Sequence, residues 1–232
     1  MSHQPVDPSR PLGDLVTERE SRGEVLEHFG LDFCCGGKKT LRAACAELKI
    51  RVEDVVQALD ASDRTAPAEG ARDWTKATLR DLTDHIVGTH HVFLRQALPE
   101  LEFKVRKIAD VHGEHHPELL QVRDTFLTLR KEIEAHMEKE EDVVFPAVKA
   151  AEAKKKAGDV KAAMKELEDE HEIVGDALHR IRALTKSYAV PPDACPTYRA
   201  ALKGLSALEM DTHHHVHKEN NILLPRARRL LS

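Results

Sequence analysis

One pattern occurs twice in this chain and restricts the possible fold more than any other feature. The segments that begin at His136 and His215 read HMEKEEDVVFP and HVHKENNILLP. In each segment a Glu follows the His four residues later, at Glu140 and Glu219, and a Pro stands ten residues after the His. Residues four apart on an α-helix project from the same face. Each segment is therefore predicted to be helical, with an imidazole and a carboxylate directed at one point.

Long amphipathic segments fill the chain beyond Trp74. They are predicted at about residues 77–109, 118–154, 159–187 and 196–230, and the connections contain the turn-forming sequences HGEHHPE, KKKAGD and AVPPDACP. Four long helices joined by short connections are typical of an up-down four-helix bundle. Aromatic residues make up only 4% of the chain, which also favours helices over sheets. We therefore expect an all-α fold.

A smaller helical unit is expected to precede the bundle. It contains short helix-forming stretches on both sides of LDFCCGGKKTL, and Thr40 can cap the helix TLRAACAELK. The residues that follow are rich in Ala, Pro and polar side chains, as linkers often are. The predicted organisation is a small N-terminal helical domain over 1–62, a linker over 63–75 and a bundle over 76–232.

Apolar residues recur on each long helix at alternating spacings of three and four, as they do on the buried face of a bundle helix. Histidine interrupts all four apolar stripes. The histidines and glutamates at the interruptions are His91, His136, Glu140, His171, His215 and Glu219. A single histidine on an apolar face is more often a hydrogen-bonded core residue than a metal ligand. Four such histidines with two carboxylates are better explained by a bound cation, because an unpaired buried carboxylate is costly.

The type of ligand indicates the type of metal. Four imidazoles and two carboxylates without a thiolate suit iron or manganese better than zinc, which takes fewer ligands and often uses Cys. Ferritin-like di-iron bundles place Glu and His three residues apart. Here the spacing is four, and histidines outnumber carboxylates. The pattern therefore points to a hemerythrin-like centre.

Other histidines and two further glutamates are expected to have lesser roles. Glu141 and Glu170 adjoin ligand candidates and are candidates for outer support of the ligands, although glutamates at such positions mostly face water. The histidines that lack a matched glutamate on the buried stripe, or that lie in the loop near residue 112, are expected to be unassigned or solvated. They are His85, His90, His112, His115, His116, His213, His214 and His217.

Adjacent Cys34 and Cys35 are followed by two glycines and two lysines. Glycines let the backbone approach a partner closely, and nearby lysines favour the thiolate over the thiol. The pair is either a redox or metal-transfer site at the surface of the small domain or two partly buried residues at a tight turn. Cys45 and Cys195 have no ligand partner in the pattern and are expected to be structural.

Composition and charge limit the partners and the compartment. The net charge is −5 with acids and bases interspersed and no basic stripe, so nucleic acid is not expected as a partner. The chain lacks a run of 18 apolar residues, and its first residues lack the apolar core of a signal peptide, so no membrane segment is expected. Four sparse cysteines favour a reducing compartment, and we expect a cytoplasmic protein.

Five segments together resemble one known family. They are DFCCGGKKTL, HHVFLRQALPEL, HMEKEEDVVFP, EDEHE and HHHVHKENNILLPRA. They resemble the repair-of-iron-centres (RIC) family, the YtfE/ScdA-like di-iron proteins, over nearly the whole chain and in the same order. The resemblance implies a small helical domain before a hemerythrin-like up-down four-helix bundle. It also implies two non-haem iron ions with an oxo or hydroxo bridge, and these ligands: His91, His136, Glu140, His171, His215 and Glu219.

The resemblance also implies a function. Proteins of this family help to restore iron–sulfur clusters damaged by nitric oxide or peroxide, so we expect an iron donor whose partners are the damaged proteins, with Cys34 and Cys35 as an iron-transfer or redox pair. Two alternatives remain open. One is a di-iron nitric oxide reductase or scavenger, and the other is a hemerythrin-like sensor of dioxygen or nitric oxide. A monomer and a homodimer are equally compatible with the pattern.

Overall fold

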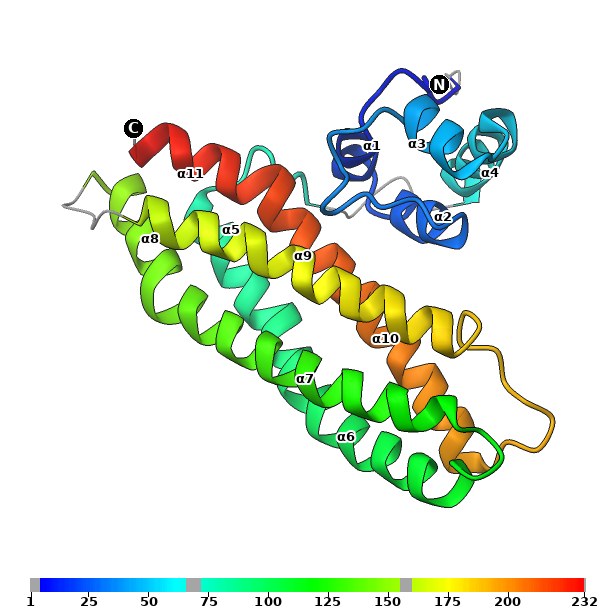
Figure 1. The fold of residues 1–232 in the computed structure, drawn as a ribbon. Helices are drawn as coiled ribbons and strands as arrows, with labels where there is room; N and C mark the ends of the chain where they lie inside the picture. The colour runs from blue at the N-terminus through cyan, green and yellow to red at the C-terminus, as the bar shows by residue number, and fades with distance from the viewer. Residues whose placement is uncertain (1–4, 66–71, 155–159, 232) are drawn as a thin grey trace. The chain divides into compact units, whose positions relative to one another are not determined.

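The computed structural model describes residues 5–65, 72–154 and 160–231. Across these residues the chain is helical and contains no strand (Figure 1). It divides into two compact units, one consisting mainly of residues 1–82 and 213–230 and the other of residues 83–212. The predicted all-α class is confirmed.

Four short helices form the N-terminal part of the first unit. They are α1 Leu12–Glu18, α2 Arg22–His28, α3 Leu41–Leu48 and α4 Val52–Thr65. Thr40 caps α3 as predicted, because its hydroxyl accepts a hydrogen bond from the Ala43 amide at 3.2 Å. Apolar side chains from all four helices and the intervening loop share one core, which includes Leu12, Leu15, Leu26, Phe33, Leu41, Val55 and Leu59.

A buried ion pair joins two of these helices. Arg22 of α2 donates a hydrogen bond to the Asp63 carboxylate of α4 at 2.7 Å and another to the Leu15 carbonyl at 3.1 Å. The side chains of Arg22 and Asp63 are only 7% and 2% exposed. Breaking such a pair leaves one charge buried without compensation, which is strongly destabilising.

The second unit is built on long helices that follow one another up and down (Figure 1). The part of the chain from residue 79 onward, here called the bundle sequence, forms four helical runs. The first run consists of α5 Leu79–Ile86, η1 Val87–His91 and α6 Val92–His112, and the second of α7 Glu118–Lys139, η2 Glu140–Val144 and α8 Phe145–Glu152. The third run is α9 Lys161–Leu184, and the fourth consists of α10 Pro196–Lys218, η3 Glu219–Leu223 and α11 Leu224–Leu231. These runs agree with the four predicted segments to within three residues at each end. Most of the predicted connection KKKAGD, like 66–71 of the predicted linker, lies outside the described residues.

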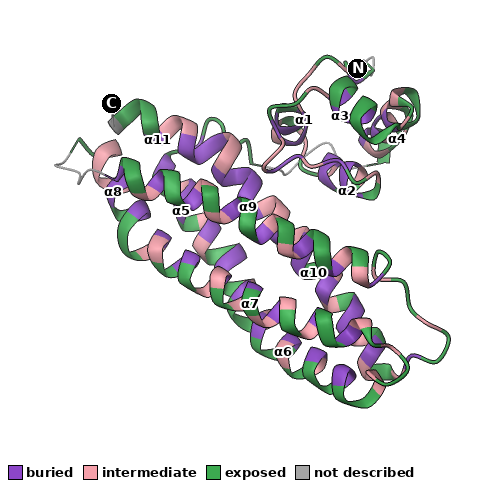
Figure 2. Ribbon diagram, in the orientation of Figure 1, coloured by how far each residue is buried: buried purple, intermediate pink, exposed green. Residues whose placement is uncertain are grey.

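Each long helix of the second unit has a buried face and an exposed face (Figure 2). The buried faces meet in one apolar core, to which α6 contributes Leu94 and Leu98, α7 contributes Phe126, and α10 contributes Leu205 and Leu208. This is the stripe spaced by three and four residues that the sequence predicted. None of the described helices has the length and apolar character needed to cross a membrane.

Three single π-helical turns, η1, η2 and η3, interrupt the α-helices of the bundle sequence. Two of them follow from the repeated sequence pattern. Pro146 and Pro225 have no N–H and cannot donate to the carbonyls four residues earlier, those of Asp142 and Asn221, which lie inside η2 and η3. The sequence repeat is therefore also a structural repeat, an α-helix followed by a π turn and another α-helix.

Candidate metal centre

Each π turn carries one of the predicted metal ligands. His91 is the last residue of η1, and Glu140 and Glu219 are the first residues of η2 and η3. A π turn makes the helix locally wider and commonly marks a functional site. The sequence pattern predicted these side chains on one helical face but did not predict the π turns that carry them.

Four of the predicted ligands form a buried cluster within the second unit. The Glu140 carboxylate, 0% exposed, lies 3.2 Å from Nε2 of His91 and 3.5 Å from Nε2 of His136. The two Nε2 atoms of His136 and His171 are 3.1 Å apart. The cluster therefore brings together one residue from η1, one from α7, one from η2 and one from α9.

The remaining two predicted ligands form a buried pair in the first unit. His215 at the end of α10 and Glu219 at the start of η3 approach within 2.8 Å, from Nε2 to Oε1. The two residues are 3% and 1% exposed. The pair repeats the arrangement of His136 and Glu140 on the second helical run, as the matching sequence segments predicted.

Two neighbouring carboxylates hold the outer nitrogens of the clustered histidines. Nδ1 of His91 lies 2.5 Å from Oε1 of Glu141, and Nδ1 of His136 lies 2.8 Å from Oε2 of Glu170. An ionised carboxylate only accepts hydrogen bonds, so each Nδ1 is the donor. A neutral imidazole protonated at Nδ1 keeps its lone pair on Nε2. Both rings therefore direct the Nε2 lone pair to the interior of the cluster, the arrangement that metal-ligating histidines adopt.

The acidity of both supporting glutamates fits this arrangement. The hydrogen bond from His136, together with Lys139, lowers the pKa of Glu170 to about 2 even though burial opposes the shift. Burial also raises the pKa of Glu141, but the hydrogen bonds from His91 and Arg95 outweigh it and the pKa is lowered overall. Glu141 and Glu170 are therefore charged at neutral pH, and both contact histidines of the cluster instead of facing water alone.

The donor set of this cluster suits a cation of moderate softness. Imidazole nitrogens and a carboxylate are ligands that iron accepts readily. The 3.1 Å between Nε2 of His136 and Nε2 of His171 is a separation that two ligands on one ion adopt, since each metal–nitrogen bond is about 2.1 Å long. The Nε2 lone pairs of His91 and His136 lie near the buried Glu140 carboxylate, and such groups repel one another unless a proton or a cation lies among them.

Several of the remaining histidines lie elsewhere. His90 is buried but its Nδ1 is 2.9 Å from an Asp211 oxygen, outside the cluster. Three others surround the ring of Phe33 in the first unit at centroid distances of 5.5 to 6.1 Å, namely His213, His214 and His217. Burial lowers the pKa of His217 to about 4 and keeps it neutral. His213, His214 and His217 therefore pack against Phe33, which belongs to the loop that carries Cys34 and Cys35.

The carboxylate of Asp32 organises the loop that holds Cys34 and Cys35. It accepts hydrogen bonds from the amides of Cys34, Cys35 and Gly36 at 2.9, 3.0 and 2.8 Å and from the Cys34 thiol at 3.1 Å. One ligand atom from each of Asp32, Cys34 and Cys35 lies within 4.8 Å of the others. Sequence reasoning missed Asp32. The available signal was an Asp two residues before the pair, where its side chain can cap a turn.

The cysteine loop also contacts η3 within the first unit. The Asn221 amide donates to the carbonyls of Phe33 and Cys34 at 3.3 and 3.2 Å. Gly37 permits this approach, because a Cβ there would lie 2.6 Å from Oδ1 of Asn221 and 2.7 Å from the Phe33 carbonyl. The glycine after the pair is therefore needed for close packing, as the sequence suggested.

The thiol of Cys34 is not activated as the neighbouring lysines suggested. A hydrogen bond with Cys35, burial and the nearby Asp32 carboxylate raise its pKa well above 9. Lys39 pairs with Glu47 at 2.6 Å instead of approaching the thiols. The sulfur atoms of Cys34 and Cys35 are 3.9 Å apart, a distance that two sulfur ligands on one ion adopt when each bond is about 2.3 Å.

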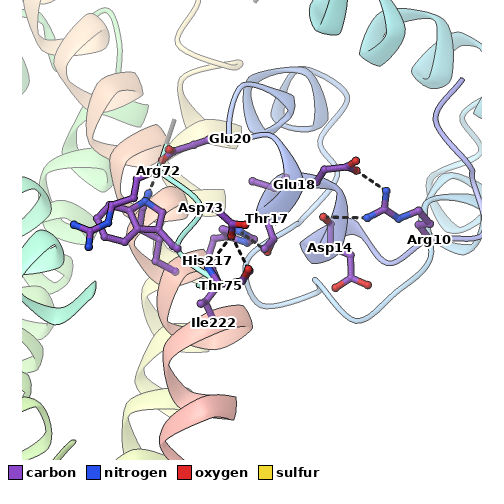
Figure 3. A pocket seen from close by; sticks show the side chains of 13 residues that line it. Arg10, Asp14, Thr17, Glu18, Glu20, Arg72, Asp73, Thr75, His217 and Ile222 are labelled. Atoms are coloured by element: carbon purple, nitrogen blue, oxygen red, sulfur yellow. Dashed lines mark hydrogen bonds and ion pairs between the residues drawn. The ribbon is translucent and has the colours of Figure 1, made fainter. Parts of the chain in front are cut away.

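The first unit also contains a cavity of about 400 Å³ with charged walls. Figure 3 shows Thr17 and His217 directed at each other across it, 3.3 Å from Oγ1 to Nε2, and Arg10 on the rim beside Glu18. Its charges are mixed, since both acidic and basic side chains line it. None of the predicted metal ligands is among its described lining residues.

Two family models match the chain. The hemerythrin HHE cation-binding domain matches residues 84–227, and a domain of unknown function (DUF542), the ScdA N-terminal domain, matches residues 8–63. Proteins named iron-sulfur cluster repair protein YtfE from Salmonella typhimurium, Escherichia coli O81 and Escherichia fergusonii are 33%, 35% and 34% identical to it. Each alignment covers 94% of this chain and 96% of the relative.

The chain belongs to the YtfE/ScdA-like family of hemerythrin-domain repair proteins. The resemblance predicted from the CCGGK segment and the paired His–Glu motifs is thus confirmed. The hemerythrin match extends over both His–Glu pairs, and the ScdA N-terminal match extends over Cys34 and Cys35. Binding of metal, with iron as the metal that the hemerythrin domain indicates, follows for this chain. The predicted domain boundaries and ligand set remain predictions.

Proposed function

We propose that this protein restores damaged iron–sulfur clusters by supplying iron that it holds in a di-iron centre. The observation that carries the proposal is the combination of a buried His/Glu cluster with similarity to proteins named for iron–sulfur cluster repair over 94% of the chain. The partners are then proteins with damaged clusters in the cytoplasm, and the protein acts as a monomer or homodimer.

In this proposal six side chains share two non-haem iron ions joined by an oxo or hydroxo group. The six are His91, His136, Glu140 and His171 of the second unit and His215 and Glu219 of the first. The assignment is supported by the match of the hemerythrin model to residues 84–227, which contains all six. It is also supported by the two equivalent positions of Glu140 and Glu219 in the structural repeat, which suit them to bridge the ions.

The protein residues around the centre have defined tasks. Glu141 and Glu170 hold the Nδ1 protons of His91 and His136 and so keep both Nε2 lone pairs directed inward. Arg95 and Lys139 neutralise these outer carboxylates. Nitrogen and oxygen ligands bind iron less tightly than a cage of thiolates does. Iron as the cargo is therefore held in a form that a thiolate-rich client can take up.

We assign Cys34 and Cys35 a place in the transfer of iron or in its redox state. Their sulfur separation of 3.9 Å and the nearby Asp32 carboxylate support a transient soft site for the cargo. Nitric oxide, which damages clusters, is a small ligand for the same iron, and this accounts for the connection with nitrosative stress.

A reconstitution experiment tests the proposal. Iron-loaded protein is incubated anaerobically with an iron–sulfur enzyme damaged by nitric oxide, and recovery of client activity is compared with that given by the same quantity of ferrous salt. We expect faster and more complete recovery with the loaded protein. Glu140→Gln removes a proposed ligand and should lose most of this advantage. Glu138→Gln changes an exposed glutamate on the same helix and should keep it.

Two outcomes would contradict the donor proposal. One is recovery no better than with ferrous salt, or recovery unaffected by Glu140→Gln. The other is repeated turnover of nitric oxide to nitrous oxide under reductant with no iron transferred to the client, which identifies a di-iron reductase instead.

A further inference from the structure

Cys195, which the sequence pattern left without a partner, is paired with a histidine. Its Sγ lies 3.2 Å from Nε2 of His112. His112 ends α6, and Cys195 directly precedes α10, so the α6–α7 and α9–α10 connections meet at one end of the second unit (Figure 1). Both side chains are partly exposed. Cys195, expected to be structural, therefore has a histidine partner that the sequence pattern did not indicate.

The N-terminus of α10 adds a second source of stabilisation for a negative sulfur. The backbone amides of Tyr198 and Thr197 donate to the sulfur of Cys195. α10 is 23 residues long, and the partial positive charge of such an N-terminus favours an anion. Hydrogen bonding from His112, followed by that from the Tyr198 amide, lowers the pKa of Cys195. By contrast, the pKa values of buried Cys34 and Cys45 are raised.

The imidazole of His112 is held in position by its surroundings. Its ring packs against the ring of Tyr198, with centroids 5.4 Å apart, and against His116 at 6.5 Å. His116 is fixed in turn by Asp193 and Glu118, each at 3.1 Å, and these carboxylates raise its pKa. An apolar cluster that includes Ile108, Leu119, Ala194, Tyr198 and Leu202 underlies this end of the bundle. The Cys–His pair is thus part of an ordered site.

A cavity of about 590 Å³ lies beside residues that neighbour the pair, although Cys195 and His112 themselves do not line it. Its walls include Asp193 and Tyr198, which flank Cys195 in the chain, together with His116, Glu118 and Lys186. Charges of both signs therefore line a space large enough for a small molecule. Such walls suit a zwitterionic peptide-like thiol better than an apolar compound.

We propose that Cys195 is a thiol–disulfide exchange site that takes up a small zwitterionic thiol from a low-molecular-weight disulfide. The Cys195 thiolate, its proton held by His112, attacks one sulfur of the disulfide. A new sulfur–sulfur bond forms to Cys195 while the original bond breaks, and the leaving thiolate accepts the proton from the His112 imidazolium. One disulfide is exchanged for another, so no further oxidant or reductant is consumed. The site lies about 30 Å along α6 from His91, given 1.5 Å per helical residue, and is independent of the proposed iron centre.

Limited thiolation of the full-length protein tests this site. The reduced protein is treated near neutral pH with less than one equivalent of oxidised glutathione, and the modified cysteine is identified by peptide mass mapping. We expect glutathione mainly on Cys195. Rates are then measured with dithiodipyridine, and His112→Ala should slow the reaction of Cys195 by about tenfold. Its rate–pH profile should also move to higher pH, a change that a purely structural role for His112 does not produce.

A matched variant and two outcomes decide the result. His179→Ala removes an exposed histidine on α9 and should leave the rate unchanged. Cys195→Ser should abolish the fast phase. Preferential modification of Cys35 would overturn the proposal. The proposal would also fail if His112→Ala left both the reaction rate and the pH profile of Cys195 unaltered.

Discussion

Single carboxylates determine which ring nitrogen of His91 and of His136 faces the interior of the cluster. Glu141 and Glu170 each accept a hydrogen bond from a ring nitrogen and so direct the other nitrogen into the cluster. Their sequence positions made them candidates, but adjacency alone does not distinguish a glutamate that contacts a neighbouring helix from one that faces water. Glu170 reaches His136 from α9, a contact that depends on how α7 and α9 pack.

Removing the charge of Glu170 should weaken iron binding without removing a ligand. Glu170→Gln can still accept a hydrogen bond from Nδ1 of His136 but no longer strengthens the basicity of the ring. Loss of such an outer partner typically weakens metal binding by about 10- to 100-fold. Competition with a chelator measures the affinity. Glu168→Gln, which changes a partly exposed glutamate of α9 outside the cluster, is the control. An affinity equal to that of the wild type would contradict the role assigned to Glu170.

The same residue predicts a pH effect in the iron-free protein. The pKa of Glu170 falls from an ordinary 4.5 to about 2 in the folded state. A depressed carboxyl pKa contributes stability that is present above 4.5 and is lost as pH falls towards 2. The difference in free energy of unfolding between wild type and Glu170→Gln should therefore shrink as the pH is lowered from about 5. Chemical denaturation across this range checks it, and a constant difference would contradict it.

At the scale of helices, the repeated His–Glu motif shows which features the sequence predicted and which it missed. Spacing by four placed His136 with Glu140 and His215 with Glu219, and the structure has both pairs buried. It did not indicate the π turns, because an extra residue in one helical turn does not alter the local His–Glu spacing. Pro146, six residues after Glu140, was the available sign. Contacts between segments distant in sequence, such as that of His112 with Cys195, could not be read from periodicity at all.

The π turn η2 should be sensitive to Pro146. Pro146→Ala restores an N–H that can bond to the Asp142 carbonyl and so favours an ordinary α-helical turn. We expect the iron-free protein to keep its stability, whereas iron affinity falls by about tenfold as Glu140 is displaced. Pro99→Ala, inside α6 and away from any π turn, should leave the affinity intact. Equal affinities for the two variants would show that Pro146 does not position Glu140.

The ion pair between α2 and α4 should dominate the stability of the small helical unit. Asp63→Ala leaves the buried Arg22 with only the half-exposed Glu18 as an ionic partner, and should cost about 3 kcal/mol of unfolding free energy. Asp54→Ala breaks an exposed pair with Arg51 and should cost no more than about 0.5 kcal/mol. Denaturant unfolding followed by circular dichroism measures both. Similar losses for the two variants would contradict the importance given to burial.

Across the whole molecule, the sequence correctly indicated the fold class and the family, since long amphipathic helices and paired motifs are local patterns that survive folding unchanged. Features that arise from tertiary packing could not be predicted from the sequence in the same way. Asp32 caps the cysteine loop, and the hydrogen bond with Cys35 together with burial, rather than the neighbouring lysines, raises the pKa of Cys34. Both depend on the loop conformation and on its contact with Asn221.

We propose that this chain holds two iron ions on side chains of its hemerythrin-like domain. Elemental analysis of anaerobically purified, iron-loaded protein tests it most directly, with Glu140→Gln and Glu219→Gln beside the wild type. We expect about two iron atoms per wild-type chain and a clear loss in each variant, with Glu138→Gln unchanged. Zinc at about one atom per chain, or an iron content that neither ligand variant reduces, would contradict the account.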